Sequence, residues 1–350
     1  MTLELIITTH CNLNCGYCYY KGISKQVMTF ETAKRAIDLL CMTAIDKKDP
    51  KLYISFFGGE PLLNKELIYK CVEYANTNYK NKINIGYALA TNGTLLDDDF
   101  ISFIKKEMFI VHISIDGTET VHNTNRPAKD GQNSFRMTEQ SIDKLPRDYL
   151  YVATVITVKS LEYIVESIDY LLSKNINKII LTVDYGDNWD ADLFNKLKKT
   201  YKMLLNKYKS LNKNSKKTTI TLFDDKINLI ETGCSYKKYC CNLGRDIFVI
   251  APNGDIFPCT RFADRSKGMD YSTGNIFCGM NKENLQIVEN ARDKDKKECV
   301  NCDIKDICLG NSCSCISYSS TGTISGILPF ICEHERMLVK LIYESKLINS

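Results

Sequence analysis

The feature that most constrains the fold of this chain is an alternation of β-rich runs and amphipathic stretches over its first two-thirds. Such an alternation predicts βα units, whose parallel strands join through right-handed crossovers into one sheet. The six predicted strands are residues 3–8, 52–57, 83–91, 109–115, 151–157 and 178–183. The predicted helices are residues 30–45, 65–79, 97–106, 134–144, 161–173 and 193–208. Periodicity leaves open whether the sheet forms part of a barrel or an open doubly wound sheet, but either fold gathers ligands at the carboxyl ends of its strands.

The cysteines give a second constraint. Of the sixteen, three stand together near the N-terminus, two are isolated, and eleven lie between Cys234 and Cys332. No secretory signal precedes the first strand, so metal clusters explain this content better than disulfides. No apolar run is long enough to span a membrane, and we therefore expect a soluble, cytoplasmic protein. The net charge of +4 is too weak to indicate a nucleic-acid partner.

Cys11, Cys15 and Cys18 follow the first predicted strand directly, with the spacing C-x3-C-x2-C. Three thiolates on one short loop can bind three irons of a [4Fe–4S] cube and leave the fourth iron open. Gly16 and the neighbouring asparagines supply the turn-prone backbone that such a loop needs. A zinc site with His10 as fourth ligand is the alternative. Zinc would explain neither the preceding strand nor the motifs at the following strand ends.

This loop, with Tyr17 immediately before its last cysteine, resembles the signature of the radical S-adenosylmethionine (radical SAM) enzymes. The resemblance implies an α/β fold with a partial (β/α)6 TIM-like barrel. It also implies that the amino and carboxylate groups of SAM chelate the open iron. Reductive cleavage of SAM would then give a 5′-deoxyadenosyl radical that abstracts hydrogen from a substrate. Tyr17 is expected to contact the cofactor.

The second predicted strand ends in Gly58, Gly59 and Glu60. Adjacent glycines let a backbone approach a ligand closely, and a carboxylate suits an ammonium group. In the radical SAM family, this Gly-Gly-Glu motif binds the amino group of SAM. A plain turn from strand to helix is the alternative, but the position after the cysteine loop favours the binding role.

Further polar residues at strand ends are weaker candidates. Asn92 follows the third strand, and Ser114 and Asp116 end the fourth, where they could meet the ribose or the sulfonium of SAM. Asp184 ends the sixth strand and could contact the substrate. It could equally well cap the turn that follows.

The segment from His122 to Arg126 resembles the His-Asn-x-x-Arg segment of radical SAM enzymes that modify peptides and proteins. In that family Arg126 would pair with the carboxylate of SAM, a role that a planar guanidinium fills well. We expect His122 to fix the loop rather than to act as a base.

The cysteines after residue 233 form a second pattern, which resembles the SPASM domain. This small C-terminal module carries two auxiliary [4Fe–4S] clusters in maturases of ribosomal peptides and of sulfatases. By position, the first auxiliary cluster would be held by Cys234, Cys240, Cys259 and Cys313. The second would be held by Cys299, Cys302, Cys308 and Cys332. Within this region Asn253-Gly254 is a tight-turn signal, and the runs on either side of it predict a hairpin.

Two alternatives stay open in the first of these sets. Cys241 adjoins Cys240, and Cys315 could replace Cys313. A zinc ribbon would account for Cys299 and Cys302 alone, whereas eight thiolates favour two cubes. The remaining cysteines, which we expect to be packing residues, are Cys41, Cys71 and Cys278.

These patterns predict three regions: the radical SAM barrel at 1–190, a basic helix and linker at 191–233, and the SPASM domain at 234–350. An amphipathic helix at 336–347 should cover the SPASM domain. Residues 195–219 carry nine lysines and no acidic residue. A solvated helix face explains them most simply, and a landing surface for an acidic peptide is the alternative.

The reaction class implied is hydrogen abstraction by a cofactor-derived radical. Sulfatase maturases carry an Asp directly after the cysteine of their Pro-Cys step, where this chain has Thr260 and then Arg261. A hydroxyl is a poor replacement for a carboxylate base. We therefore expect a maturase that forms a thioether or carbon–carbon crosslink in a ribosomally made precursor peptide, with a flavodoxin or ferredoxin as reductant. Asp184 and Arg261 are the candidates for a direct role in catalysis.

Three other functions remain open. The first is formylglycine formation in a sulfatase, the second is radical dehydrogenation or epimerisation of a small molecule, and the third is electron transfer without catalysis. An electron-transfer protein would have no use for the Gly-Gly-Glu motif or for Arg126. The first strand begins at Leu3, so no leader-recognition domain is expected before it, and the peptide would bind another surface or another protein.

Overall fold

The fold is described from a computed structural model of the chain. The structure describes all residues except 21–22, 49–50, 214–217, 240–242, 264–269 and 348–350. The chain divides into two compact units, each made of several segments. Unit 1 comprises Met1–Asn12, Cys18–His112 and Cys241–Lys294. Unit 2 comprises Leu13–Tyr17, Ile113–Cys240 and Asp295–Ser350. The division into regions 1–190, 191–233 and 234–350 stays a prediction.

Unit 1 contains a seven-stranded run of the sheet, in the order β11-β10-β9-β8-β1-β2-β3. The strands are β1 (Thr2–Thr8), β2 (Lys51–Gly58), β3 (Asn84–Thr91), β8 (Ile247–Ile250), β9 (Asp255–Phe257), β10 (Gly274–Asn275) and β11 (Gly279–Met280). β1, β2 and β3 pair in parallel, with Leu3 opposite Ile54 and Leu52 opposite Ile85. β1 is buried on both faces, as parallel strands covered by helices usually are.

The hairpin predicted around Asn253-Gly254 is confirmed. β8 and β9 pair antiparallel, and Gly254 adopts φ 89°, a conformation that favours glycine. β8 also pairs in parallel with β1, with Thr2 opposite Ile247. The hairpin of the C-terminal third therefore extends the sheet that begins at the N-terminus.

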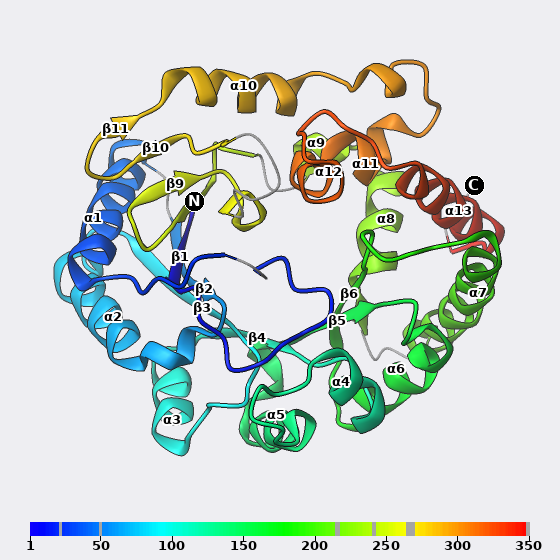
Figure 1. The fold of residues 1–350 in the computed structure, drawn as a ribbon, viewed down its shortest axis with the longest axis horizontal. Helices are drawn as coiled ribbons and strands as arrows, with labels where there is room; N and C mark the ends of the chain where they lie inside the picture. Colours follow the sequence, from blue (N-terminus) through cyan, green and yellow to red (C-terminus); the bar gives the residue numbers. More distant parts are fainter. Residues whose placement is uncertain (21–22, 49–50, 214–217, 240–242, 264–269, 348–350) are drawn as a thin grey trace. The chain divides into compact units, whose positions relative to one another are not determined.

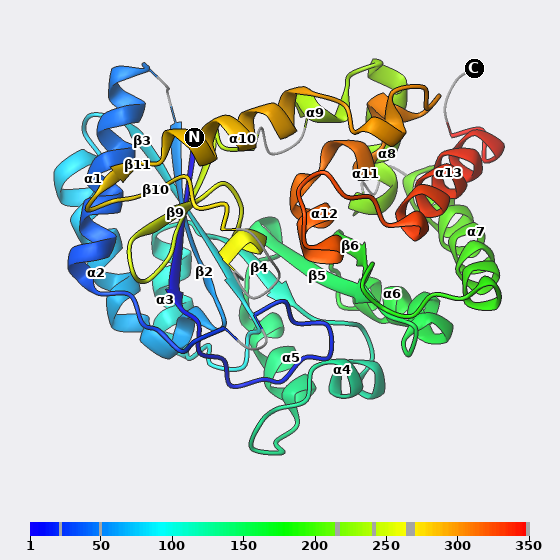
Figure 2. The same cartoon turned by 45° about the horizontal axis from the view of Figure 1, so that its top comes forward.

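The helical elements of unit 1 that follow its parallel strands are α1 (Phe30–Asp46), η1 (Pro61–Asn64), α2 (Lys65–Tyr79) and α3 (Asp98–Lys106), of which η1 is a short 3₁₀ turn. Later in the chain, unit 1 also contains the 3₁₀ turn η4 (Thr260–Ala263) and the helix α10 (Lys282–Asp293). The side chains of Thr29, Asn64 and Asp97 cap α1, α2 and α3 by accepting backbone N–H groups. α1 and α2 lie side by side in both ribbon views (Figures 1 and 2).

Unit 2 contains the parallel strands β5 (Leu150–Ile156), β6 (Lys178–Val183) and β7 (Thr219–Ile220), paired in that order. β4 (Ile110–Ser114) crosses the boundary between the two units along the chain. The helical elements of unit 2 are α4 (Glu119–Asn125), α5 (Ser134–Lys144), η2 (Arg147–Tyr149), η3 (Leu161–Tyr163), α6 (Ile164–Ser173), α7 (Ala191–Lys213), α8 (Thr221–Thr232), α9 (Tyr236–Tyr239), η6 (Lys297–Cys299), η7 (Lys305–Ile307), α11 (Leu309–Ser312), α12 (Ser314–Thr321) and α13 (Pro329–Glu344). α13 packs against α7 and α8 (Figure 2).

All six predicted strands are confirmed to within one residue at each end. The predicted helices are also confirmed, although the one predicted at 193–208 extends to Lys213. The bounds predicted for the last helix were wrong, since α13 begins at Pro329 and ends at Glu344. Proline is well suited to the first turn of a helix, where its missing N–H costs nothing. The early start places Cys332 in the first turn of α13.

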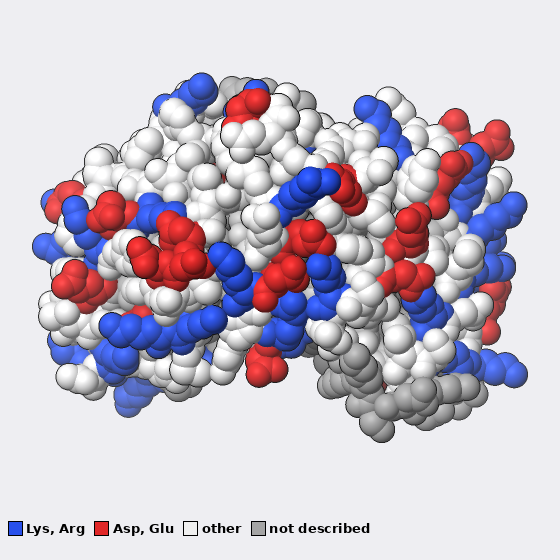
Figure 3. Space-filling view, turned by 90° about the horizontal axis from the view of Figure 1, so that it is seen from below, with Lys and Arg blue, Asp and Glu red and all other residues white. Residues whose placement is uncertain are grey.

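None of the helices in the described part of the chain combines the length and apolar composition that a membrane crossing needs. On the face shown in Figure 3, basic and acidic side chains are interspersed. This distribution agrees with the weak net charge of +4.

Candidate functional site

The Gly-Gly-Glu motif lies where β2 ends, and it runs along the start of the cysteine loop. Gly59 donates its N–H to the carbonyl of Thr8 (2.8 Å), and Glu60 donates its N–H to the carbonyl of His10 (2.8 Å). A Cβ atom at Gly58 or Gly59 would come within 2.2 Å of the carbonyl oxygens of Thr8 and His10. The two glycines are therefore needed for the close passage of this turn against the loop.

The carboxylate of Glu60 is completely buried. It accepts hydrogen bonds from the Thr91 hydroxyl (2.7 Å) and from the backbone N–H groups of Asn92 (2.8 Å) and Leu62 (3.0 Å). Burial raises the pKa of Glu60 to about 7, although these hydrogen bonds oppose the shift. An ionised carboxylate offers about four acceptor positions, so one remains for a further donor. The structure thus presents a fixed, buried carboxylate at the end of β2.

Asn92, at the end of β3, contacts the cysteine loop itself. Its side-chain amide lies 3.8 Å from the sulfur of Cys11 and donates to the side chain of Asn12 (2.9 Å). Asn12 in turn donates to Thr94 (2.8 Å). Sequence reasoning assigned Asn92 to SAM, and that role stays a prediction. What the structure shows is that Asn92 holds the beginning of the loop.

In unit 2, Arg126 and Asp116 form a buried bidentate ion pair. Nε and Nη2 of Arg126 each lie 3.0 Å from a carboxylate oxygen of Asp116. The same carboxylate accepts the Tyr17 hydroxyl (2.6 Å) and the N–H of Val155 (3.1 Å). Burial alone would raise the pKa of Asp116, but the charge and hydrogen bonds of Arg126 hold it below its usual range. The pair occupies the edge of the guanidinium formed by Nε and Nη2, so a SAM carboxylate would have to reach Nη1 or displace Asp116.

The middle of the cysteine loop, residues 13–17, is held by the segment around Arg126. Asn14 and Gly16 donate their N–H groups to the carbonyls of Pro127 (2.8 Å) and Asn125 (2.9 Å). The ring of Tyr17 lies 5.2 Å from the guanidinium carbon of Arg126. The loop around Cys15 is therefore fixed by backbone and side-chain contacts within unit 2.

His122 is fully buried on α4, and its Nδ1 lies 3.4 Å from the backbone N of Asp116. Burial and the neighbouring Arg126 charge lower its pKa to about 3. A neutral imidazole that accepts a backbone N–H agrees with the expected loop-fixing role.

The weaker candidates lie at their predicted strand ends. Ser114 is the half-buried last residue of β4. Asp184 follows β6, and its side chain accepts the N–H of Gly186 (3.0 Å), so it does cap the following turn. In unit 1 the guanidinium of Arg261 lies 5.1 Å from the ring centroid of Tyr19, and the Tyr19 hydroxyl lies 3.5 Å from that of Thr260. Tyr19 follows Cys18 directly, a link between the loop and Arg261 that sequence reasoning missed.

The cysteines of the second auxiliary set lie in unit 2, and three of them influence one another electrostatically. The pKa of Cys299 is raised, mainly by burial. The charges of Cys332 and Cys302 raise it further. Cys302 donates its N–H to the carbonyl of Cys299 (3.0 Å), and Nη2 of Arg336 lies 3.1 Å from the Cys302 sulfur. A guanidinium at a sulfur suits a thiolate, the form in which cysteine binds iron.

Cys308, the fourth member of this set, is buried, and the backbone on either side of it is held by hydrogen bonds. The buried pair of Lys226 and Glu335 (2.7 Å) holds the carbonyl of Ile307 (2.5 Å) and the N–H of Leu309 (2.7 Å). No sequence pattern predicted this clamp, because its two charged members lie on α8 and α13, far apart in the chain.

The first auxiliary set is less completely described. Cys234 is exposed, whereas Cys259 and Cys313 are half-buried. Cys315, the alternative to Cys313, is almost completely buried at 2% exposure. The choice between Cys240 and Cys241 lies outside the described residues. The ligands of this cluster stay a prediction.

Of the three cysteines expected to be packing residues, two fulfil that role. Cys41 and Cys71 are fully buried, and burial raises the pKa of each to about 12. Cys278 is exposed, so the packing interpretation was wrong for this residue. It lies in the turn between β10 and β11.

In the described part of the chain, no group of three or more His, Cys, Asp or Glu side chains is placed closely enough to hold a metal ion. The cluster assignments rest on the chemistry of the donors. None of Cys11, Cys15 and Cys18 forms a disulfide, and all three are half-buried. Thiolates are the ligands that iron–sulfur clusters prefer, so the loop fits a [4Fe–4S] cube.

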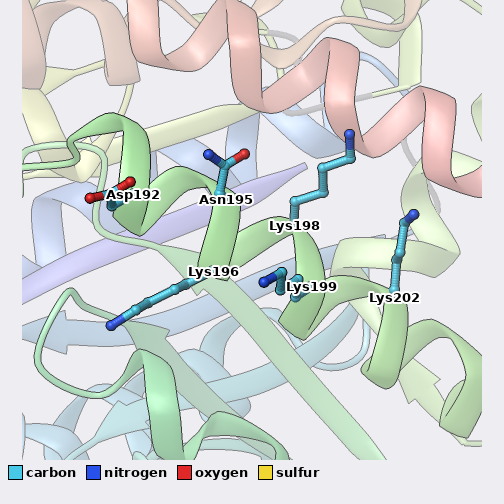
Figure 4. Close-up of a pocket in the computed structure, with 6 residues that line it drawn as sticks. All are labelled: Asp192, Asn195, Lys196, Lys198, Lys199 and Lys202. Atoms are coloured by element: carbon cyan, nitrogen blue, oxygen red, sulfur yellow. The ribbon is translucent and has the colours of Figure 1, made fainter.

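A basic groove runs along α7, with a volume of about 620 Å³. It is lined by Asp192, Asn195, Lys196, Lys198, Lys199 and Lys202 (Figure 4). Lys196 is engaged with Glu162 (3.0 Å). The groove agrees with a solvated basic helix face, and its use by an acidic peptide stays a prediction.

Comparison with known proteins places these features in a family. The model of the "Radical SAM superfamily" matches residues 5–197. An uncharacterised protein of Methanocaldococcus jannaschii is 34% identical over 265 residues, which are 73% of this chain and 84% of that protein. A cysteine-type anaerobic sulfatase-maturating enzyme of Clostridium novyi is 24% identical over 86% of this chain and 84% of its own length.

Two solved structures are similar over nearly the whole chain. The structure of native anSMEcpe with bound AdoMet gives a TM-score of 0.80 at 21% identity and covers 99% of this chain and 100% of that one. SuiB of Streptococcus suis, bound to its precursor peptide SuiA, gives 0.62 at 17% identity and covers 95% and 75%. The predicted fold class is thereby confirmed: a mixed α/β fold with a partial, barrel-like parallel sheet and a cysteine-rich C-terminal region.

Proposed function

The chain belongs to the radical SAM superfamily, and we propose that it is an enzyme that modifies a peptide or protein substrate by abstracting hydrogen. Both of these similar proteins have been solved with a bound peptide. The peptide is Cp18Cys in a structure of anSMEcpe and the precursor peptide SuiA in a structure of SuiB. Similarity over nearly the whole of this chain, including the cysteine-rich region, supports a substrate of the same class.

The observation that carries this proposal is the way in which the chain holds the loop of Cys11, Cys15 and Cys18. Its beginning is held by Asn92 and by the Gly-Gly-Glu turn, and its middle by the backbone around Arg126. We assign to these three thiolates the cluster that binds SAM. When bound, cluster and SAM together supply the radical chemistry, while the protein provides orientation and excludes water.

The roles proposed for the other residues follow from their chemistry. Glu60 is a buried carboxylate with one acceptor position left, which suits an N–H of the SAM amino group. Asp116 and Arg126 fix Tyr17 and the loop, and Nη1 of Arg126 is the donor that we assign to the SAM carboxylate. An electron-transfer protein would have no use for these groups.

Within this class we favour formation of a thioether or carbon–carbon crosslink in a ribosomally made peptide. The residue after Cys259 is Thr260, which is only 9% exposed and whose hydroxyl lies 3.5 Å from that of Tyr19. It offers no carboxylate that could act as a base. The second candidate is formylglycine formation in a sulfatase, which the similarity to sulfatase-maturating enzymes favours. Asp184 and Arg261 are the residues proposed to act on the substrate.

We propose that the eight further cysteines bind two auxiliary [4Fe–4S] clusters, whose role is electron transfer and support of the C-terminal region. A reductant such as a flavodoxin or a ferredoxin would supply the electrons.

The test uses anaerobically reconstituted protein with SAM, a reductant and two kinds of peptide. One is a short precursor peptide encoded beside this protein, and the other is a sulfatase segment with a cysteine at the modified position. A crosslink removes two hydrogens without creating an aldehyde, and a thioether also blocks a thiol from alkylation. Formylglycine instead reacts with a hydrazide probe. Release of 5′-deoxyadenosine with neither peptide changed would contradict the proposed substrate class.

A further inference from the structure

Lys296 is a buried cation in the segment that leads into Cys299. Its side chain is only 6% exposed. The ammonium group donates to the carbonyls of Gly310 (2.5 Å) and Gly326 (3.4 Å) and to the hydroxyl of Ser317. All three acceptors are neutral, so the chain satisfies the hydrogen bonds of Lys296 without compensating its charge.

Within the described residues, no carboxylate lies within ion-pair distance of Lys296. The adjacent Asp295 is committed elsewhere, since it accepts from Lys237 (2.9 Å), Lys305 (3.1 Å) and Asn311 (2.9 Å). The other buried lysine nearby shows the contrast, because Lys226 is paired with Glu335. A buried charge without a partner is strongly unfavourable, and such groups are usually paired.

Lys296 contacts the segments that carry three of the proposed cluster ligands. Its carbonyl accepts the N–H of Cys299 (2.9 Å), and its ammonium group donates to the carbonyl of Gly310, two residues after Cys308. The ammonium group also donates to the hydroxyl of Ser317, which in turn donates to the carbonyl of Cys313 (3.3 Å). Each of these cysteines belongs to one of the proposed auxiliary ligand sets. A [4Fe–4S]²⁺ cube bound by four thiolates carries a net negative charge, which is the counter-charge that the protein chain does not provide.

We propose that Lys296 is the counter-charge of the auxiliary clusters and that it raises the reduction potential of the cluster nearest to it. This inference rests on the auxiliary ligation proposed above. Reduction adds one negative charge to a cluster, and a fixed cation in a low-dielectric interior stabilises the reduced form more than the oxidised form. Charge near a cluster and hydrogen bonding are among the factors that set its potential. Lys296 is thus a positioning and tuning residue, and it need not touch the substrate.

The test measures reduction potentials in the reconstituted full-length protein by redox titration monitored by electron paramagnetic resonance. Lys296→Gln removes the charge but keeps a hydrogen-bond donor, and Lys296→Arg keeps the charge. Lys297→Gln is the matched control, because Lys297 is closer to Cys299 in sequence but exposed. We expect Lys296→Gln to lower the potential of one auxiliary cluster at unchanged iron content. The other two variants should keep the wild-type potentials.

Three outcomes would overturn the role of Lys296. The first is wild-type potentials in Lys296→Gln at full iron content, and the second is an equal shift in Lys297→Gln. The third is loss of iron from both Lys296→Gln and Lys296→Arg, which would show that side-chain shape rather than charge matters. Loss of iron from Lys296→Gln alone would support the proposal, because the charge would then be needed to retain the cluster. If wild-type protein binds no iron beyond the cysteine loop, the auxiliary ligation fails instead.

Discussion

Glu60 is the residue on which the proposed SAM site depends most. We expect Glu60→Gln to weaken SAM binding by ~1.5–3 kcal/mol, the typical worth of a hydrogen bond to a charged group. Iron content should stay unchanged, since Glu60 is not a cluster ligand. Isothermal titration of the reconstituted protein with SAM measures this effect. Glu66→Gln, at an exposed position of α2, is the matched control. Equal SAM affinity in Glu60→Gln would mean that the motif is only a turn.

The same residue predicts a pH dependence of SAM binding. Burial raises the pKa of Glu60 to about 7. Below this pH the carboxyl group is protonated and becomes a weaker hydrogen-bond acceptor for the SAM amino group, so SAM affinity should rise as the pH increases from about 6 to about 8. Affinities measured across this range should rise for the wild-type protein and stay flatter for Glu60→Gln. A parallel rise in both proteins would assign the pH dependence to another group.

Asp116 was a weak candidate for contact with SAM, but we expect it to contribute strongly to the stability of the fold. Asp116→Asn leaves the guanidinium of Arg126, 6% exposed, without a full counter-charge. Breaking such a buried pair costs about 3–5 kcal/mol. Denaturant unfolding of the metal-free protein measures it. Glu31→Gln, which removes an exposed pair with Arg35, should cost at most about 1 kcal/mol. Equal effects of the two variants would contradict a structural role for Asp116.

At this scale the sequence predicted which residues matter better than what they contact. The need for two glycines before Glu60 follows from local chemistry, and the structure shows the close passage that requires them. The pairing of Arg126 with Asp116 was not predictable. The two side chains meet because β4, α4 and β5 pack together, and sequence spacing does not encode that packing. Lys296 carried no signal, since its isolation from carboxylates depends on tertiary contacts.

Among the elements, α8 and α13 are joined by the buried pair of Lys226 and Glu335, which also clamps the backbone on both sides of Cys308. Burial alone would raise the pKa of Glu335, but the charge of Lys226 lowers it to about 2. We expect Lys226→Met to cost about 3–5 kcal/mol in denaturant unfolding, because it leaves a buried carboxylate unpaired. The variant should also lose iron from the cluster that Cys308 is proposed to bind.

The control for this clamp is the double variant Lys226→Met with Glu335→Gln, which removes both charges. It should recover a large part of the lost stability, since replacing a buried pair completely is often close to neutral. A double variant as unstable as the sum of the two single ones would show that the two side chains do not act together.

Helices and strands were predictable from the sequence where the pattern that encodes them lies within the segment itself. The strands and helices of the first two-thirds follow from hydrophobic period, which is read within each segment. Pairing of β8 with β1 joins residues about 245 positions apart, and no local pattern encodes it. The start of α13 at Pro329 was missed, although proline is favoured in the first turn of a helix.

For the whole molecule, the arrangement of the sixteen cysteines predicts how much iron the protein binds. Three separately ligated cubes imply about twelve irons per chain after anaerobic reconstitution. Replacing Cys11, Cys15 and Cys18 together by Ala should leave about eight irons and abolish SAM cleavage, because a cube with only solvent ligands does not survive. Iron assays and detection of 5′-deoxyadenosine measure both effects. Unchanged cleavage would contradict the assignment of the catalytic cluster.

The last prediction fixes the ligands of the first auxiliary cluster. Cys240→Ala should lose one cluster, about four irons, while Cys241→Ala should lose none. The same comparison separates Cys313, which is half-buried, from Cys315, which is 2% exposed. The reverse result at 240 and 241 would shift the register by one residue. If neither cysteine matters, three ligands hold the cluster and one iron is open to a thiolate of the substrate. Thioether formation would then be the chemistry to test first.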